Sequence, residues 1–309
     1  METTAARTPS RRTMLTLGAG AALAAAFSAG GGTAFASTPG ADAIARRFGE
    51  LERRYSARLG VFARNLRTGR TVRHNADDLF PMCSTFKTLA VAAVLRDLDR
   101  DGEFLAKRVH YTKEYAEKSG YDKITGRPEN VANGMTIEEL CAAAISFSDN
   151  AAANLLLTEL GGPSAVTRLC RSLGDRVTRL DRWEPDLNTA EPGRLTDTTT
   201  PRAIGQTYAR LVVGNALDRG DRERLKGWLL ANTTSDERFR KNLPAGWTVG
   251  DKTGTGSYGT GNDVGIAWTP DGSPVVLSVL TTTTTGNAKA AASDALIAET
   301  AALLRAKLG

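Results

Sequence analysis

The chain has 309 residues, of which 41% are hydrophobic and 24% charged, and its formal net charge is +6. These proportions are those of a folded globular protein and exclude collagen-like, coiled-coil and wholly disordered chains. The basic excess is spread along the sequence and only 6% of the residues are aromatic, so nucleic acid is not an expected partner.

The first 36 residues have the order of an export signal. Arg11-Arg12 precedes an apolar run over residues 14–27, and Ala34-Phe35-Ala36 supplies a small-residue cleavage site before Ser37. The run is too short to span a bilayer comfortably, so cleavage is favoured over a membrane anchor. The arginine pair resembles a twin-arginine signal, but the Sec route stays open. We therefore expect a secreted or extracytoplasmic monomer without stable membrane association.

Hydrophobic spacing then predicts a helix followed by two short strands. Apolar side chains recur every three or four residues over 42–56, which indicates an amphipathic helix. Residues 58–63 and 71–74 have the composition of strands and are joined through a Thr68-Gly69 turn. From residue 80 to about 230 the patterns are mostly helical.

The clearest helical pattern covers residues 136–160. Thr136-Ile137-Glu138-Glu139 is a capping box at its start, and Gly161-Gly162-Pro163 ends it. Strand patterns return at residues 248–251, 264–268 and 274–282, with a turn at 270–272, and a closing helix is expected over 288–308. Strands at both ends of a helical middle predict one α/β unit with an all-α unit inserted.

The first chemistry-bearing motif is Ser84-Thr85-Phe86-Lys87, at the start of an apolar helix predicted over residues 84–98. The spacing puts the hydroxyl of Ser84 and the amine of Lys87 on one helical face. The helix N-terminus adds positive potential where an alkoxide would form. A lysine so placed can activate the serine as a nucleophile, although the motif alone is common by chance.

Two polar motifs follow. Ser148-Asp149-Asn150 interrupts the apolar pattern of the helix predicted over 136–160, as functional residues often do, although a solvated helical face would look similar. Glu184 and Asn188 lie in a stretch punctuated by proline and glycine. An ordered loop there would let a carboxylate and an amide share one water molecule.

The last motif, Lys252-Thr253-Gly254, follows the strand predicted over 248–251 and opens a glycine-rich segment. Its glycine lets a substrate approach the strand backbone, and its lysine and threonine can hold an anion. Residues 254–259 also match GxGxxG, but a strand rather than a helix is predicted next, so a dinucleotide site is rejected. The chain has two histidines and no HExxH or CxxC motif, and neither metal nor cofactor is expected.

The order SxxK, SDN, ExxLN and KTG resembles that of the class A serine β-lactamases over essentially the whole mature length. The resemblance implies a two-domain α+β fold. Residues 37–79 and 231–309 would form an α/β domain with a five-stranded antiparallel sheet and flanking helices, and residues 80–230 an all-α domain. It also implies hydrolysis of the β-lactam ring of penicillins and some cephalosporins, giving antibiotic resistance without a cofactor.

The resemblance assigns roles to the matching positions. Ser84 would open the lactam ring, Lys87 would assist proton transfer, and Ser148 would pass a proton to the ring nitrogen. Glu184 would activate the deacylating water, and whether Lys87 or Glu184 is the base for acylation stays open. The implied substrate-binding residues are Asn150, Asn188, Lys252, Thr253, Gly254, Thr255, Arg238 and, at the entrance, Tyr121.

Two further assignments concern charged residues around the site. Arg182 and Asp197 match the salt-bridged neck of the family's Ω-loop. Many members bind the substrate carboxylate with an arginine on the strand after KTG, where this chain has Thr260-Gly261-Asn262. Arg238 aligns with an alternative arginine that some members use.

The three cysteines are not expected to need a cross-link. Cys141 matches half of a disulfide in some members, but the partner position is Val91, so that bridge should be absent. A second bridge, from Cys83, would need a cysteine where this chain has Gly256. Whether Cys141 and Cys170 pair stays open.

The nearest alternative is a penicillin-binding D,D-peptidase, which shares the serine and lysine chemistry. It lacks the loop that holds Glu184 and Asn188, so these two residues favour hydrolysis. A non-enzymatic β-lactam receptor domain would need a membrane tether, which the sequence does not suggest. A Ser-His-Asp esterase is disfavoured because there is no GxSxG motif and because His74 and His110 match no triad.

Overall fold

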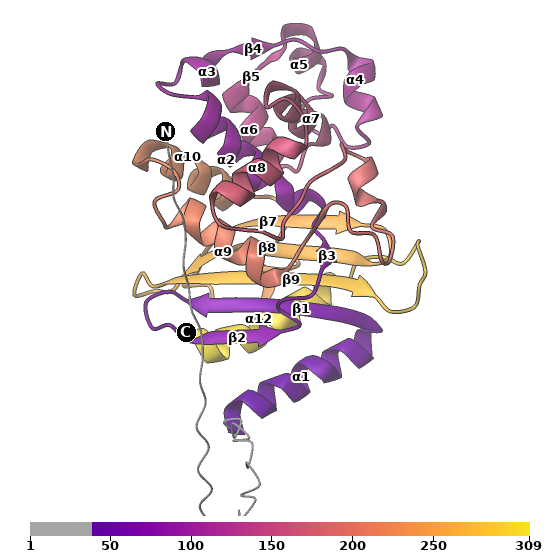
Figure 1. Cartoon of the computed structure of the whole chain (residues 1–309), viewed down its shortest axis with the longest axis vertical. Coiled ribbons are helices and arrows are strands. Elements are labelled where there is room, and N and C mark those ends of the chain that lie inside the picture. The colour runs from indigo at the N-terminus through magenta and orange to yellow at the C-terminus, as the bar shows by residue number, and fades with distance from the viewer. Residues whose placement is uncertain (1–38) are drawn as a thin grey trace, which may run out of the picture. The chain divides into compact units, whose positions relative to one another are not determined.

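The computed structural model describes the chain from Pro39 to Gly309, so the predicted export signal lies outside the described residues. The main sheet has five antiparallel strands in the order β2-β1-β9-β8-β7, which joins strands from both ends of the chain (Figure 1). The strands are β1 (Ala57–Asn65), β2 (Thr71–His74), β7 (Thr248–Gly256), β8 (Thr260–Trp268) and β9 (Pro274–Thr283). The predicted fold class is confirmed.

Helices cover both faces of this sheet. α9 (Pro201–Val212) packs on one face, and α1 (Pro39–Tyr55) and α12 (Asp294–Leu308) pack on the other. Successive side chains of a strand point to opposite faces, so Val61 and Phe62 of β1 belong to different hydrophobic clusters. This explains why the strands are apolar almost throughout rather than alternating with polar residues.

The remaining helices gather beyond the edge strand β7 and around the apolar helix α2, which is buried along its whole length (Figure 1). They are α2 (Phe86–Ala93), α3 (Glu103–Ala106), α4 (Lys113–Lys118), α5 (Pro128–Asn133), α6 (Ile137–Ser146), α7 (Asn150–Glu159), α8 (Ser164–Ser172) and α10 (Arg219–Leu230), with the turns η1 (Cys83–Thr85), η2 (Val94–Leu98) and η3 (Asp186–Thr189). The short helix α11 (Phe239–Asn242) is the exception, because it packs against α12. Two short ladders pair β3 (Phe80–Pro81) with β6 (Thr198–Thr199) and β4 (Arg108–Val109) with β5 (Met135–Thr136). No helix within residues 39–309 is long and apolar enough to cross a membrane.

The prediction of one continuous helix over residues 136–160 is wrong. The capping box at its start is present, but the helix ends at Ser146 and α7 begins at Asn150. Between them, Ser148 has a left-handed backbone with φ +61°. The carboxylate of Asp149 then caps α7 by accepting a hydrogen bond from the backbone of Ala152. The polar triplet is therefore the junction of two helices rather than a polar patch on one.

Two other predicted boundaries also change. The strand expected over residues 248–251 continues to Gly256, so the KTG motif lies within β7 and not after it. The closing helix starts at Asp294 instead of residue 288. The carbonyls of Ala288 and Ala290 accept hydrogen bonds from the turn between β7 and β8, which ties that segment to the sheet instead of to the helix.

Candidate active site

The nucleophile candidate lies in the turn that leads into α2. Ser84 belongs to η1, and Lys87 follows it by one turn on the same side, as predicted. The Nζ of Lys87 donates a hydrogen bond of 3.0 Å to the Oγ of Ser84. Cys83, just before the serine, has φ +44°, a strained conformation for a residue other than glycine. The backbone here is therefore bent sharply where the hydroxyl meets the amine.

Lys87 is fully buried and makes contact with every polar motif of the site except KTG. Its Nζ donates to the Oδ1 of Asn150 at 2.6 Å and to the carbonyl of Ser148 at 2.8 Å. It also forms an ion pair with the Oε1 of Glu184 at 3.0 Å. Burial lowers the pKa of Lys87, whereas the negative charge of Glu184 acts to raise it. The lysine thus joins the nucleophile to the carboxylate.

Glu184 is buried and is held on three sides. Its Oε1 accepts a hydrogen bond of 3.3 Å from the Oγ of Ser84, and its Oε2 accepts one from the side chain of Asn188. The amide of Asn154 on α7 bonds both the backbone N–H and the carbonyl of Glu184, at 3.0 and 2.9 Å. Asn154 was not predicted, although a single asparagine within the apolar run 151–157 was a signal for it.

The loop that carries Glu184 is closed at its neck. The Nε of Arg182 lies 2.6 Å from the Oδ2 of Asp197, which is itself buried. The other oxygen of Asp197 accepts hydrogen bonds from the backbone of Asp181 and of Arg182, at 2.8 and 2.9 Å. The two ends of the segment 182–197 are therefore tied together, which orders the loop between them.

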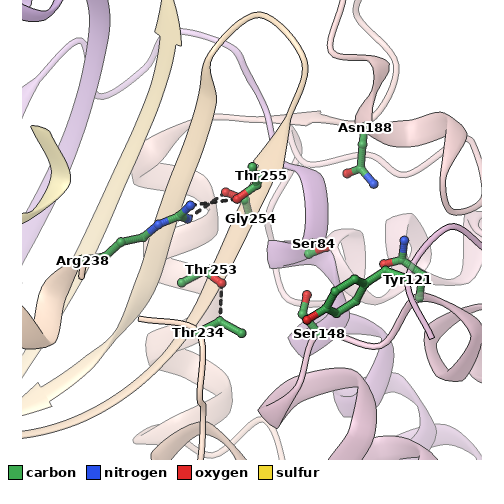
Figure 2. A pocket seen from close by; sticks show the side chains of 10 residues that line it. Ser84, Tyr121, Ser148, Asn188, Thr234, Arg238, Thr253, Gly254 and Thr255 are labelled. Carbon is green, nitrogen blue, oxygen red and sulfur yellow. Dashed lines mark hydrogen bonds between the residues drawn. The ribbon is translucent and has the colours of Figure 1, made fainter. Parts of the chain in front are cut away.

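Asp149, the middle residue of the SDN motif, organises the opposite wall. Its Oδ2 accepts the backbone N–H groups of Ile124 and Thr125, both at 2.9 Å, and both of its oxygens contact the hydroxyl of Thr125. These bonds hold the segment that carries Tyr121, which is 44% exposed at the entrance. The aspartate therefore fixes the shape of the site, and the side chain of Ser148 next to it faces the cavity (Figure 2).

These elements enclose a cavity of about 310 Å³ between the edge strand β7 and the helical side. Its lining residues are Ser84, Tyr121, Ser148, Asn150, Asn188, Thr234, Arg238, Thr253, Gly254 and Thr255. Figure 2 shows the two walls, with the strand residues facing the two serines and Asn188 across the opening. All of these except Thr234 were predicted as site residues.

The strand wall carries a buried cation. The guanidinium of Arg238 donates to the Oγ1 of Thr255 at 2.8 Å and to the carbonyl of Gly254 at 2.9 Å (Figure 2). It also donates to the carbonyl of Asn262 at 2.6 Å. An ion pair of 2.8 Å with Asp294, at the start of α12, completes its contacts. Arg238 is thus held rigidly beside the hydroxyl that lines the cavity. Asp294 was not predicted, because nothing near it in the sequence marks it.

Lys252 is fully buried and does not itself line the cavity. Its Nζ donates to the carbonyl of Thr253 at 3.0 Å. Burial lowers the pKa of Lys252 well below its usual range, and the positive charge of Lys87 adds to this effect. The hydroxyl of Thr253 lies 2.5 Å from that of Thr234, a residue that was not predicted (Figure 2).

All three cysteines are free and buried. Cys141 and Cys170 therefore do not pair with each other. A Cβ on Gly256 would lie 2.7 Å from the Sγ of Cys83, so these two positions are already in close contact. Burial raises the pKa of each thiol, which disfavours its thiolate form.

A serine hydrogen-bonded to a buried lysine, with a carboxylate against both, is the arrangement expected of an enzyme with a nucleophilic serine. The profile of the β-lactamase enzyme family matches residues 43–308. A β-lactamase of Streptomyces lavendulae is 65% identical over 309 residues, which is all of both chains. The solved β-lactamase of Streptomyces albus G is 60% identical and superposes with a TM-score of 0.85, covering 86% of this chain and 100% of that one. An ancestral class A β-lactamase is 49% identical with a TM-score of 0.78, covering 84% and 98%.

The chain therefore belongs to the β-lactamase enzyme family and is a class A serine β-lactamase. It hydrolyses the β-lactam ring, the reaction that confers resistance to these antibiotics. The prediction of family and activity is confirmed.

Proposed function

We propose that the enzyme hydrolyses penicillins, and some cephalosporins, through an acyl-enzyme on Ser84 that is released by a water molecule activated by Glu184. The observation that carries the proposal is the position of the Glu184 carboxylate, 3.3 Å from the Oγ of Ser84 and 3.0 Å from the Nζ of Lys87. A base for deacylation has to lie within reach of the water that attacks the acyl-enzyme, and a carboxylate this close to the nucleophile meets that requirement.

In the acylation step, the Oγ of Ser84 attacks the lactam carbonyl and its proton passes to a neighbouring base. Lys87 and Glu184 both lie within hydrogen-bond distance of that oxygen, so both are candidates for the base. The backbone amides of Ser84 and Thr255 would stabilise the oxyanion. Ser148, which is 3.4 Å from the Nζ of Lys87, would pass a proton to the departing ring nitrogen.

In the deacylation step, Glu184 removes a proton from the water that attacks the ester. Asn188 donates to the same carboxylate and would hold that water in place. The clamp from Asn154 on the backbone of Glu184 supports this role, because a base must keep its geometry within a fraction of an ångström. The ion pair of Arg182 and Asp197 would keep the loop closed during turnover.

The substrate would lie along the edge of β7. Arg238, Thr253 and Thr255 would bind its carboxylate, with Lys252 adding positive potential from behind the strand. Asn150 would bind the acylamide side chain: one of its N–H groups donates to the carbonyl of Ser119, which leaves the second for the substrate. Tyr121 would form the wall at the entrance, and the neighbouring Gly254 would let the substrate approach the strand.

We also propose that residues 1–36 direct export and are removed, and that the mature enzyme acts as a monomer outside the cytoplasm. The order of basic, apolar and small residues in the leader supports export. The two-domain division at residues 79/80 and 230/231 is likewise part of the proposal. The mass of the secreted protein, measured intact, tests the cleavage site after Ala36.

The decisive experiment compares the parent with Glu184→Ala. Each is incubated with a penicillin, a cephalosporin and a carbapenem while turnover and intact mass are followed, and Glu223→Ala, an exposed glutamate on α10, is the control. We expect hydrolysis by the parent and the control, and a covalent adduct that accumulates on Glu184→Ala. Stoichiometric and lasting acylation of the parent would instead favour a penicillin-binding D,D-peptidase.

A further inference from the structure

Two aspartates lie fully buried beside each other behind the substrate-binding strand, outside the catalytic cluster. Asp251 of β7 faces Gly265 in the β-sheet register, and Asp263 of β8 faces Thr253, so both side chains lie on one face as diagonal neighbours. A Cβ on Gly265 would lie 2.7 Å from the Cα and Cβ of Asp251. Position 265 must therefore be glycine, because any side chain there would collide with Asp251.

Both aspartates hold the same short segment of the chain. The Oδ1 of Asp251 accepts hydrogen bonds from Arg240 at 3.1 Å and from Asn232 at 3.2 Å. The Oδ2 of Asp263 accepts the backbone N–H of Phe239 at 3.2 Å. Two carboxyl groups from adjacent strands therefore anchor α11 at its first and second residues.

Arg238 is the residue immediately before this anchored helix. One of its nitrogens donates at 2.6 Å to the carbonyl of Asn262, the neighbour of Asp263 on β8. We propose that Asp263, held against Asp251, is a positioning residue that fixes the guanidinium of Arg238 beside Thr255. It thereby sets the affinity of the enzyme for the carboxylate of its substrate. The inference rests on the proposed function, in which Arg238 binds that carboxylate.

The arrangement of the pair favours a shared proton. Neither Asp251 Oδ2 nor Asp263 Oδ1 has a hydrogen-bond partner among residues 39–309, although both atoms are buried. Burial raises the pKa of Asp263 well above its usual range, and the charge of Asp251 adds to this. The other ionisable groups that act on the pair are Lys252, Arg238, Arg240 and Tyr208. A proton shared by Asp251 Oδ2 and Asp263 Oδ1 would satisfy both atoms and leave one negative charge on the pair.

The shared proton identifies the substitution that should preserve the arrangement. In Asp263→Asn, the amide oxygen can accept the N–H of Phe239 while the amide nitrogen donates to Asp251, as the protonated acid does. Asp263→Leu has a similar branched shape and a larger volume, and it can make neither bond. The two variants therefore separate the hydrogen bonds of Asp263 from its shape.

The test measures KM and kcat for benzylpenicillin and for its methyl ester, which lacks the carboxylate charge. We expect Asp263→Leu to raise KM for benzylpenicillin about tenfold, while kcat stays within about threefold and KM for the ester within about twofold. Asp263→Asn should keep both KM values within about twofold of the parent. An equal rise for the two substrates in Asp263→Leu, or an Asn variant as impaired as the Leu variant, would overturn the inference.

Arg238→Ala distinguishes this inference from the proposed function. If it raises KM for benzylpenicillin more than for the ester while the Asp263 variants do not, the carboxylate subsite stands and the positioning role fails. If Arg238→Ala itself does not discriminate between the two substrates, the proposed subsite is wrong. Should Asp263→Leu fail to fold, the inference is tested by infrared difference spectra between the parent and Asp263→Asn at neutral pH. We expect the carbonyl band of a protonated carboxyl in the parent and its loss in Asp263→Asn, and a parent without that band would overturn the inference.

Discussion

The Nζ of Lys87 and the Oε1 of Glu184 lie 3.0 Å apart, and neither side chain is exposed to solvent. Taking two charges out of water costs several kcal/mol, which only their mutual attraction and their hydrogen bonds recover. Removing either partner leaves the other as an uncompensated buried charge. The two residues that the chemistry requires therefore also depend on one another for stability.

A double-mutant cycle tests this dependence. Lys87→Met and Glu184→Gln should each lower the free energy of unfolding, and the double variant should lose less than the two losses added, with a coupling of about 2 kcal/mol. Chemical denaturation measures all four proteins. The exposed pair Lys113 and Glu117, 3.3 Å apart, is the matched control, with an expected coupling of about 0.3 kcal/mol. Additive losses at Lys87 and Glu184 would refute the dependence.

A second prediction concerns Asn154, which holds the backbone of Glu184 but does not line the cavity. Asn154→Ala should lower kcat about 100-fold, because a base displaced by about 1 Å loses its alignment with the water. The rate of acylation should change little, so the acyl-enzyme accumulates and is seen by intact mass. Asn133→Ala, at an exposed asparagine, should behave as the parent. Normal turnover by Asn154→Ala would show that Glu184 needs no such clamp.

Local patterns in the sequence were enough to predict the strands and the four motifs, whereas the five-stranded sheet was implied by the resemblance to the family. Strand composition and glycine-rich turns depend on neighbouring residues, and the predicted strands at β1, β2, β8 and β9 are all present. The capping box at Thr136 is also local, and it is present as predicted. The resemblance to the family then supplied the roles of the motifs, which spacing alone does not give.

The features that were missed depend on residues far apart in the chain. The break before α7 needs Asp149 to bond Ile124 and Thr125, which lie more than 20 residues earlier. Asp294 matters only because α12 brings it to Arg238, and Thr234 only because it meets Thr253. A hydrophobic pattern does not contain such pairings. Asn154 differs, because it interrupts the apolar run 151–157 and could have been predicted as a site residue on that ground.

A third prediction separates the two roles of Asp149, as a helix cap and as the anchor of the segment near Tyr121. Asp149→Ala removes four hydrogen-bonding partners and should lower the free energy of unfolding by about 3 kcal/mol. Asp218, which caps α10 and has no second role, is the control, and Asp218→Ala should cost about 1 kcal/mol. Equal losses in the two variants, measured by denaturation, would mean that the contacts to residues 124 and 125 add nothing.

The last prediction follows from the burial of Lys252. Because its pKa lies well below the usual 10.5 in the folded protein, the unfolded chain binds more protons between the two values. The stability of the parent therefore rises with pH across that interval, and at lower pH the buried ammonium destabilises the fold. Lys252→Met removes this charge, so the variant should lose activity yet be more stable than the parent by about 1 kcal/mol near neutral pH.

The sign of the pH dependence makes this test specific. The stability advantage of Lys252→Met should be largest at the acid end of a series from about pH 6 to about pH 10, and should shrink towards the alkaline end as the parent's lysine loses its proton. Lys118→Met, at an exposed lysine, should show no such trend. An advantage that grows with pH, or a variant less stable than the parent near neutral pH, would mean that the partners of Lys252 outweigh the cost of burying it.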